Sequence, residues 1–211
     1  MPQMTLHLLN AHGKLTPYGD WLSACLMQTY ELAKQVMPLP PVDVVVKTGA
    51  YIIPEKGHLG YCPEPGLVYI TVNPEYPAFC KNENRSLERM FAHELHHAVR
   101  WAGPGYGATL GKAMVSEGLA GHFALELFGG EPEPWERLGA DLLQPHLQQL
   151  RENWHRTDYD HHAWFFGTQA LPRWLGYTAG FNLVSAYLAA APHQRASTLA
   201  ATEAEAFRAF I

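Results

Sequence analysis

The chain has 211 residues, of which 47% are hydrophobic, so it is long enough to bury a sizeable core in one full-sized domain or at most two small ones. Its formal net charge of −5 and its charged fraction of 17% do not provide the basic stripe of a nucleic-acid-binding protein. There is no run of 18 apolar residues, and the first residues lack the basic and then apolar pattern of a secretory signal. We therefore expect a cytoplasmic protein with no nucleic-acid or membrane partner. The three cysteines have no C-x-x-C spacing, which favours neither a disulfide framework nor a cysteine-based zinc site.

The first 85 residues or so predict one helix and a small sheet. Apolar residues spaced by three and four over 21–36 predict an amphipathic helix, which ends before a proline-rich segment. Residues 42–46 and 66–72 are rich in β-branched side chains and predict strands, and residues 51–53 predict a shorter one. We expect these strands to form one small, mostly antiparallel sheet, with 66–72 as a candidate edge strand for an extended substrate.

From residue 86 onward the pattern is helical. Apolar periodicity and glycine or proline breaks predict five helices, over residues 86–101, 110–128, 134–154, 174–191 and 202–210. Thr202 and Glu205 have the spacing of a capping box at the start of the last helix. The expected fold class is α+β, with a sheet-containing part at about 1–85 packed on the first of these helices, and a helical part at about 86–211, in one domain over 1–211.

An H-E-x-x-H motif lies in the helix predicted over 86–101. His93 and His97 are about 40° apart on one helix face, one turn above the other, so both rings can reach one cation at roughly 2.0–2.1 Å. Glu94 projects about 60° to the side of His97, where it misses the metal but can act as general base on a metal-bound water. His96 is an alternative ligand at i+3, but the i+4 spacing favours His97 and leaves packing or support for His96.

Glu117, on the next predicted helix, is the candidate third ligand. Two histidines and one carboxylate leave the fourth position of a zinc ion for water, which is the catalytic arrangement. The alternative is a solvated helix carboxylate. Its small or apolar neighbours, and the lack of a Lys or Arg four residues away, favour the ligand. The residues thus predict a Zn²⁺ hydrolase with ligands His93, His97 and Glu117 and with Glu94 as base.

The sequence around these residues resembles a known family. Residues 93–101 (HELHHAVRW), 115–120 (VSEGLA) and 172–180 are similar to a bacterial family of predicted Zn-dependent proteases, filed as a domain of unknown function. The motif and the downstream Glu117 also resemble the gluzincin metallopeptidases, such as thermolysin. The resemblance spans roughly residues 87–188. It implies a zincin-like fold, zinc as the metal, peptide-bond hydrolysis, a peptide or protein substrate, and the same three ligands.

The chain departs from the thermolysin pattern one turn after the ligand Glu117. In that pattern an Asp at this place orients a zinc-bound histidine, whereas this chain has Gly121. Because a metal-bound histidine normally needs a partner that fixes its tautomer and ring angle, the partner must come from elsewhere. We consider Asp158, Asp160 or a backbone carbonyl.

A donor for the developing oxyanion is also needed. Tyr177, in a Gly-Tyr-x-x-Gly context, is our first candidate, with Arg173, His161 and His162 as others. Tyr177 can equally be a core tyrosine with a satisfied hydroxyl, and an ion pair is the simpler role for Arg173.

Two other patterns are given plainer interpretations. Residues 158–162 (DYDHH) lack the i, i+4 spacing of a second metal site and predict an active-site rim or a polar loop. The glycines of residues 103–107 follow a helix rather than a strand, so they predict a flexible connection rather than a phosphate cradle.

Three alternatives to a metallopeptidase stay open. They are a zinc hydrolase of a small amide or ester, a metal-binding regulatory module without turnover, and a structural domain with a chance motif. The intact Glu94 speaks against a purely structural site, which needs no base beside its ligands. The sequence leaves the oligomeric state open.

Overall fold

The computed structural model describes residues 4–211. Residues 1–3, which belong to the N-terminal segment considered above for a secretory signal, lie outside the described residues. The chain forms two compact units, residues 1–102 and 103–211. A four-stranded sheet with many helices confirms the α+β class. A single domain over 1–211 stays a prediction. Within residues 4–211, no helix is long and apolar enough to cross a membrane.

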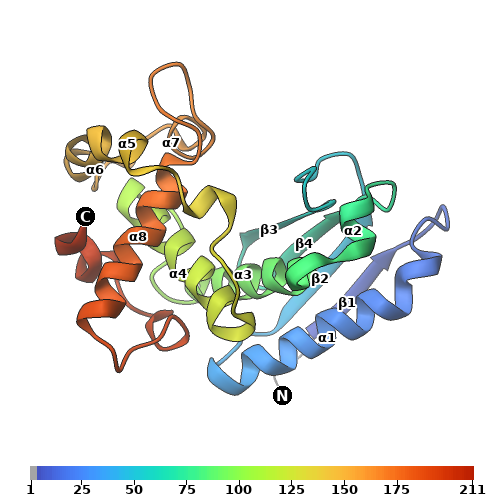
Figure 1. Cartoon of the computed structure of the whole chain (residues 1–211). Helices are drawn as coiled ribbons and strands as arrows, with labels where there is room; N and C mark the ends of the chain where they lie inside the picture. The colour runs from blue at the N-terminus through green and yellow to red at the C-terminus, as the bar shows by residue number, and fades with distance from the viewer. Residues whose placement is uncertain (1–3) are drawn as a thin grey trace. The chain divides into compact units, whose positions relative to one another are not determined.

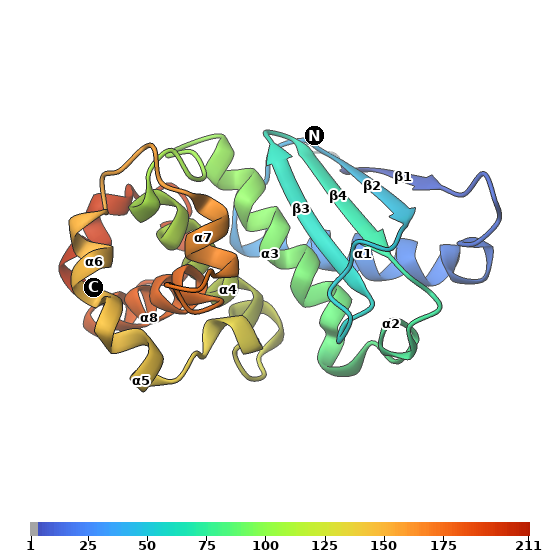
Figure 2. The same cartoon turned by 90° about the horizontal axis from the view of Figure 1, so that it is seen from above.

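The first unit contains a mixed sheet of four strands in the order β1-β2-β4-β3 (Figure 2). The strands are β1 (Met4–Leu9), β2 (Val42–Thr48), β3 (His58–Glu64) and β4 (Leu67–Val72). β1 pairs in parallel with β2, β2 pairs in parallel with β4, and β3 pairs antiparallel with β4. The expectation of a mostly antiparallel sheet is therefore wrong.

The connections explain why parallel pairs dominate. Helix α1 (Gly19–Val36) lies between β1 and β2 in the chain, and such a crossover is what a parallel pair requires. Only β3 and β4 are joined by a tight turn, at Gly66, whose φ of 75° suits glycine. The prediction lacked β1, and it placed a strand at residues 51–53, where the structure has one isolated bridge from Ile53 to His58.

β4 is an interior strand, because it is hydrogen-bonded to β2 on one side and to β3 on the other. The expectation that residues 66–72 form a sheet edge is wrong, and the edge on this side is β3. The β3–β4 register shifts between Tyr61 and Glu64, at a bulge that contains Pro63.

The core of the first unit lies between the sheet and two helices, α1 and α3 (Ser86–Trp101), which lie on the same side of the sheet (Figure 1). Alternate residues of β2 and β4 face this core, and Val44, Val46, Val68 and Ile70 have no exposed surface. These residues are cross-strand neighbours, since Val44 pairs with Val68 and Val46 with Ile70. The predicted packing of the sheet on the H-E-x-x-H helix is confirmed, and α3 contacts β3 and β4.

Short elements complete the first unit. A 3-10 turn η1 (Thr16–Tyr18) precedes α1, and α2 (Pro77–Lys81) and η2 (Glu83–Arg85) precede α3. Asn82, Asn84 and Arg85 all have positive φ, so the chain enters α3 through a tight turn. The Asn82 carboxamide stabilises this turn, because its Oδ1 accepts a hydrogen bond from the Leu87 amide at 2.8 Å.

The second unit is built on α4 (Leu110–Phe128) and α8 (Leu175–Ala190), which match the predicted helices at 110–128 and 174–191. The two helices approach each other through glycines. A Cβ on Gly118 would lie 2.2 Å from the Gly180 carbonyl oxygen, and a Cβ on Gly180 would lie 2.1 Å from the Met114 carbonyl oxygen. The backbones of α4 and α8 are thus in direct contact, and neither glycine leaves room for a side chain.

The single helix expected over residues 134–154 is wrong. The structure has four short elements there, which are η3 (Pro134–Glu136), α5 (Ala140–Leu143), η4 (Gln144–His146) and α6 (Leu147–Glu152). Gly139 and Pro145 account for the breaks, since glycine weakens a helix and proline removes one of its hydrogen-bond donors.

The last predicted helix is a 3-10 helix, η6 (Ala204–Phe210), preceded by η5 (Ser197–Leu199). The capping box expected from Thr202 is wrong, because the N-cap residue is Glu203 and makes no side-chain cap. The Glu205 carboxylate instead accepts hydrogen bonds from Trp154 Nε1 at 3.2 Å and from Arg208 at 3.1 Å. One further helix that the sequence did not predict, α7 (His161–Phe166), contacts α8.

Candidate metal centre

The histidine pair of the H-E-x-x-H motif comes together on α3. His93 Nε2 and His97 Nε2 are 3.0 Å apart, and the two rings are nearly perpendicular. Two nitrogens bound at roughly 2.0–2.1 Å to one tetrahedral zinc ion would be about 3.3 Å apart. The donor atoms therefore already have a separation that suits a shared ion. His96, the alternative ligand, is fully buried in the first unit.

Glu94 lies between the two histidines in sequence and packs on strand β3. Its side chain is buried, with 7% exposure. A Cβ on Gly60 of β3 would lie 2.6 Å from Glu94 Cγ and 2.7 Å from Glu94 Oε1. The missing side chain at Gly60 is thus what lets the carboxylate lie against the strand. The sequence analysis did not single out Gly60, and a glycine inside a strand, which marks a close approach, was the available signal.

Glu117 belongs to the second unit, where α4 holds it. It is buried, with 5% exposure, and is not the solvated carboxylate of the alternative interpretation. The Tyr106 hydroxyl donates a hydrogen bond to Glu117 Oε1. The next residue, Gly118, contacts the backbone of α8, so the helix that carries Glu117 is fixed.

Two further side chains of the second unit interact electrostatically with Glu117. Burial, followed by the Glu117 charge, raises the pKa of Tyr159 to about 12. Burial lowers the pKa of His161, while the Glu117 carboxylate opposes this shift. The Tyr159 hydroxyl lies 3.4 Å from His161 Nδ1. Glu117 therefore shares its surroundings with three groups that can donate protons, Tyr106, Tyr159 and His161, and the sequence analysis missed both tyrosines.

The glycine-rich segment 103–107, which contains Tyr106, is held in place by hydrogen bonds. Ser116 Oγ donates to the Tyr106 carbonyl at 2.8 Å, and Lys112 Nζ donates to the Pro104 carbonyl at 3.0 Å. The Tyr159 hydroxyl donates to the Gly107 carbonyl at 2.9 Å. With three such hydrogen bonds, the segment is an anchored loop rather than the flexible connection that its glycines suggested.

The two aspartates proposed as histidine partners have other contacts. Asp158 forms a surface ion pair with Arg156, with oxygen–nitrogen distances of 2.6 and 2.8 Å, and this pair lowers the pKa of Asp158. Asp160 caps α7, because its Oδ1 accepts a hydrogen bond from the Ala163 amide at 3.0 Å. Both side chains are exposed, and these contacts engage the carboxylate of each.

The predicted oxyanion donors lie on or near α7 and α8. Tyr177 is half-buried, and its ring meets Phe165 and Phe166 edge-on at centroid distances of 5.0 and 6.1 Å. The Arg173 guanidinium lies 4.7 Å from the centroid of the Trp174 ring. The role of Tyr177 stays a prediction.

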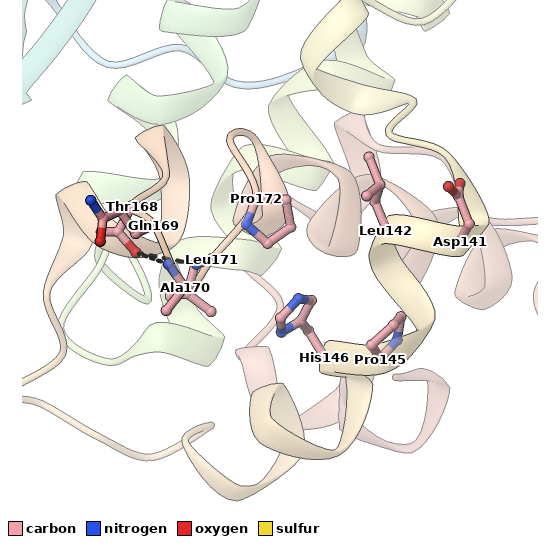
Figure 3. A pocket seen from close by; sticks show the side chains of 9 residues that line it. All are labelled: Asp141, Leu142, Pro145, His146, Thr168, Gln169, Ala170, Leu171 and Pro172. Atoms are coloured by element: carbon pink, nitrogen blue, oxygen red, sulfur yellow. Dashed lines mark hydrogen bonds between the residues drawn. The ribbon is translucent and has the colours of Figure 1, made fainter.

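The second unit also has a cavity of about 300 Å³. Figure 3 shows its lining, which is Asp141, Leu142, Pro145, His146 and residues 168–172. On one side Thr168 Oγ1 accepts hydrogen bonds from the amides of Ala170 and Leu171 at 3.1 and 3.2 Å, which closes a tight turn. None of the predicted ligands, base or oxyanion donors lines this cavity.

His93, His97 and Glu117 form a group of side chains that could hold one metal ion. Two imidazoles and a carboxylate, with a further glutamate next to the first histidine, are the donor set of zinc hydrolases. The chain belongs to a family described as predicted Zn-dependent proteases (DUF2268), whose model matches residues 22–209.

One similar protein is the uncharacterized protein YjfC of Bacillus subtilis (strain 168), with 33% identity over 118 residues. The match covers 51% of this chain and 38% of that protein, so the chain spans well under half of the relative's length. No solved structure matches this chain.

Proposed function

We propose that this protein is a zinc metallopeptidase of the gluzincin type, in which His93, His97 and Glu117 hold the metal and Glu94 is the general base. The observation that carries the proposal is the 3.0 Å approach of His93 Nε2 and His97 Nε2 on α3, next to a buried Glu94. A pair of imidazole nitrogens at this separation suits a transition metal with nitrogen ligands rather than calcium or magnesium, which prefer oxygen ligands.

When bound, zinc supplies a Lewis acid that polarises the scissile carbonyl and lowers the pKa of a coordinated water. Glu94 then accepts a proton from the attacking water and returns it to the leaving amine. Burial and the contact with β3 hold its carboxylate in one place, which favours proton transfer at a fixed atom.

Tyr177 is proposed as the donor that stabilises the developing oxyanion, as the sequence indicates. Among the other predicted donors, His161 has the strongest structural support, because it interacts electrostatically with Glu117. Tyr177→Phe and His161→Gln separate the two. Loss of turnover with unchanged zinc content in one variant would identify that residue as the donor.

The proposal is tested first by elemental analysis of the purified, zinc-reconstituted protein. We expect about one zinc per chain in the wild type and in Glu94→Gln, and a large loss of zinc in Glu117→Ala. Glu126→Gln is a matched control, because Glu126 lies on the same helix but is not a proposed ligand. Its Oε1 accepts a hydrogen bond from Ser197 Oγ at 2.6 Å. A wild-type protein that takes up no zinc would overturn the proposal.

Turnover is tested with a fluorogenic peptide library on zinc-loaded protein. Cleavage by the wild type and none by Glu94→Gln at equal zinc content would support a peptidase. Hydrolysis of small esters or amides without peptide cleavage would favour the alternative zinc hydrolase. Zinc binding with no turnover of either substrate class would favour the regulatory module.

A further inference from the structure

Strand β3 is an edge of the sheet, so part of its backbone faces away from β4 (Figure 2). Opposite residues of an antiparallel pair alternate between hydrogen-bonded and non-hydrogen-bonded pairs. The Asn73 amide donates to the Gly57 carbonyl at 2.8 Å, and the next pair in the register is His58 with Val72. Because Gly57 and Asn73 form a hydrogen-bonded pair, His58 and Gly60 present their N–H and C=O groups to the free edge of β3.

The free edge is occupied on both sides of Gly60. The His58 carbonyl accepts a hydrogen bond from the Ile53 amide at 3.1 Å, in an isolated antiparallel bridge. The Cys62 carbonyl accepts one from Trp101 Nε1 at 3.1 Å, at the bulge where the regular register has ended. Within residues 4–211, no group outside the sheet bonds the N–H or C=O of Gly60. The edge of β3 is therefore open at this one residue.

The open residue lies beside the proposed general base. A Cβ on Gly60 would lie 2.7 Å from Glu94 Oε1, so the Glu94 carboxylate is against this part of the strand. Exposed sheet edges are commonly blocked along their length, because they pair with other chains. A glycine inside a strand also marks a place where another backbone can approach closely. On β3 the blocking groups leave a gap next to Glu94, where a substrate has to pass.

We propose that Gly60 fixes the register of an extended peptide substrate, by bonding one backbone N–H and one C=O of the substrate. This proposal rests on the peptidase described under Proposed function and adds how its substrate is selected. A peptide that pairs with β3 would lie about 4.8 Å from the strand, and its side chains would not take part in the pairing. The substrate residue that donates the N–H cannot be proline, because proline has no amide hydrogen.

The open edge is tested first by amide hydrogen exchange of the zinc-loaded protein, followed by NMR. In the register above, the Tyr61 amide bonds β4 and the Gly60 amide does not. We expect Gly60 to exchange at least about tenfold faster than Tyr61, after correction for their intrinsic rates. A Gly60 amide as protected as that of Tyr61 would overturn the proposal without reference to zinc or to turnover.

The pairing is tested with a peptide that the wild type cleaves in the fluorogenic library. Each backbone amide except the scissile one is methylated in turn. We expect the kcat/KM to fall by about tenfold or more at one position, because the methyl group removes the donor and meets the strand. This position should lie within about two residues of the scissile bond, since a strand advances about 3.3 Å per residue. The peptides methylated at the other positions are the matched controls.

Binding without turnover gives a second readout. Glu94→Gln keeps the shape of the side chain against β3 and is expected not to cleave the peptide. With saturating unmodified peptide on this variant, we expect the Gly60 amide to exchange at least about tenfold more slowly than in the free variant. Bound peptide that leaves this rate unchanged would overturn the pairing.

The outcomes separate the two proposals. Peptide cleavage that no methylation impairs, or that is impaired equally at several positions, would overturn the role of Gly60 and leave the peptidase standing. Zinc-loaded protein that cleaves no peptide of the library would overturn the peptidase, and the role of Gly60 with it.

Discussion

Gly60 of β3 and Glu94 of α3 are in direct contact, with the backbone of the glycine against the carboxylate-bearing side chain. A Cβ at position 60 would also lie 2.4 Å from the Met90 sulfur. The position of the proposed general base therefore depends on a residue in a strand, and this dependence can be tested.

Gly60→Ala is expected to lower the free energy of unfolding by about 1–3 kcal/mol, because the new methyl group overlaps Glu94 and Met90. It should also reduce peptide hydrolysis at unchanged zinc content, since the displaced carboxylate is not a ligand. Urea unfolding, zinc analysis and an activity assay measure the three effects. The neighbouring Tyr61→Ala serves as control, as Tyr61 is 62% exposed. Unchanged turnover in Gly60→Ala would contradict the positioning of Glu94 by β3.

Tyr106→Phe removes the hydroxyl that donates to Glu117 Oε1. We expect the zinc affinity to fall by about tenfold, because the ligand loses the partner that orients it. Chelator competition measures the change. Tyr187→Phe is the comparison, because the Tyr187 ring packs on Phe207 and Phe210. Equal affinities in wild type and Tyr106→Phe would show that this hydrogen bond does not support metal binding.

Gly180→Ala is expected to destabilise the protein by about 3 kcal/mol or more. The added methyl group would meet the Met114 carbonyl oxygen, and a backbone atom of a helix cannot rotate away. Thermal or urea unfolding measures the loss. Asn182→Ala, on the exposed side of α8, should have almost no effect. Similar stabilities for the two variants would disprove the close backbone contact of α4 with α8.

His58 is expected to make the stability depend on pH. Burial, with a smaller effect of Lys56, lowers its pKa from 6.5 to about 3, and its Nε2 lies 2.9 Å from Ser86 Oγ. Between these two pKa values the unfolded chain binds a proton that the folded chain does not. Stability is therefore lost as the pH falls below about 6.5, by about 1.4 kcal/mol per pH unit.

Urea unfolding of wild type and His58→Gln between pH 7.5 and 5 measures this contribution. The glutamine keeps a polar group near Ser86 but does not titrate, so the variant should lose less stability over this range. The difference between the two proteins matters, because carboxylates titrate in both. Parallel pH profiles would show that His58 does not carry the effect.

The sequence predicted the helices best where an apolar face repeats over several turns. The predictions at residues 86–101 and 110–128 match α3 and α4 to the residue, and the helix carrying the H-E-x-x-H motif packs on the sheet as expected. A long uninterrupted amphipathic pattern leaves the chain few other ways to bury its apolar side chains.

The sheet was harder to predict, because pairing depends on segments that are distant in the chain. After β1 the chain passes through α1 and returns as β2, which pairs with β1. Nothing in the local sequence reveals that these two strands are partners. β3 contains Gly60 and Pro63, which weaken its strand signal. The missed strands then led to the wrong pairing directions and to the wrong edge.

The candidate ligands came from short-range spacing, which the sequence displays directly. The hydroxyl that supports Glu117 could not be predicted in this way, because Tyr106 reaches its place through folding of the loop before α4. Asp158 and Asp160, which the sequence offered as histidine partners, are exposed and bound to other groups. The residue types in a sequence do not show which carboxylates folding buries and which it leaves at the surface.

The bulge in β3 bears on self-association. At this end of the strand Pro63 has no amide hydrogen to offer, and the Cys62 carbonyl already accepts a hydrogen bond from Trp101 Nε1 at 3.1 Å. A strand from another copy of the chain would find no amide donor at Pro63 and a carbonyl at Cys62 that already accepts one hydrogen bond, so the bulge opposes edge-to-edge aggregation. Regular pairing along β3 is then limited to the stretch before the bulge, which is long enough for a short peptide but too short to nucleate a fibril-like sheet.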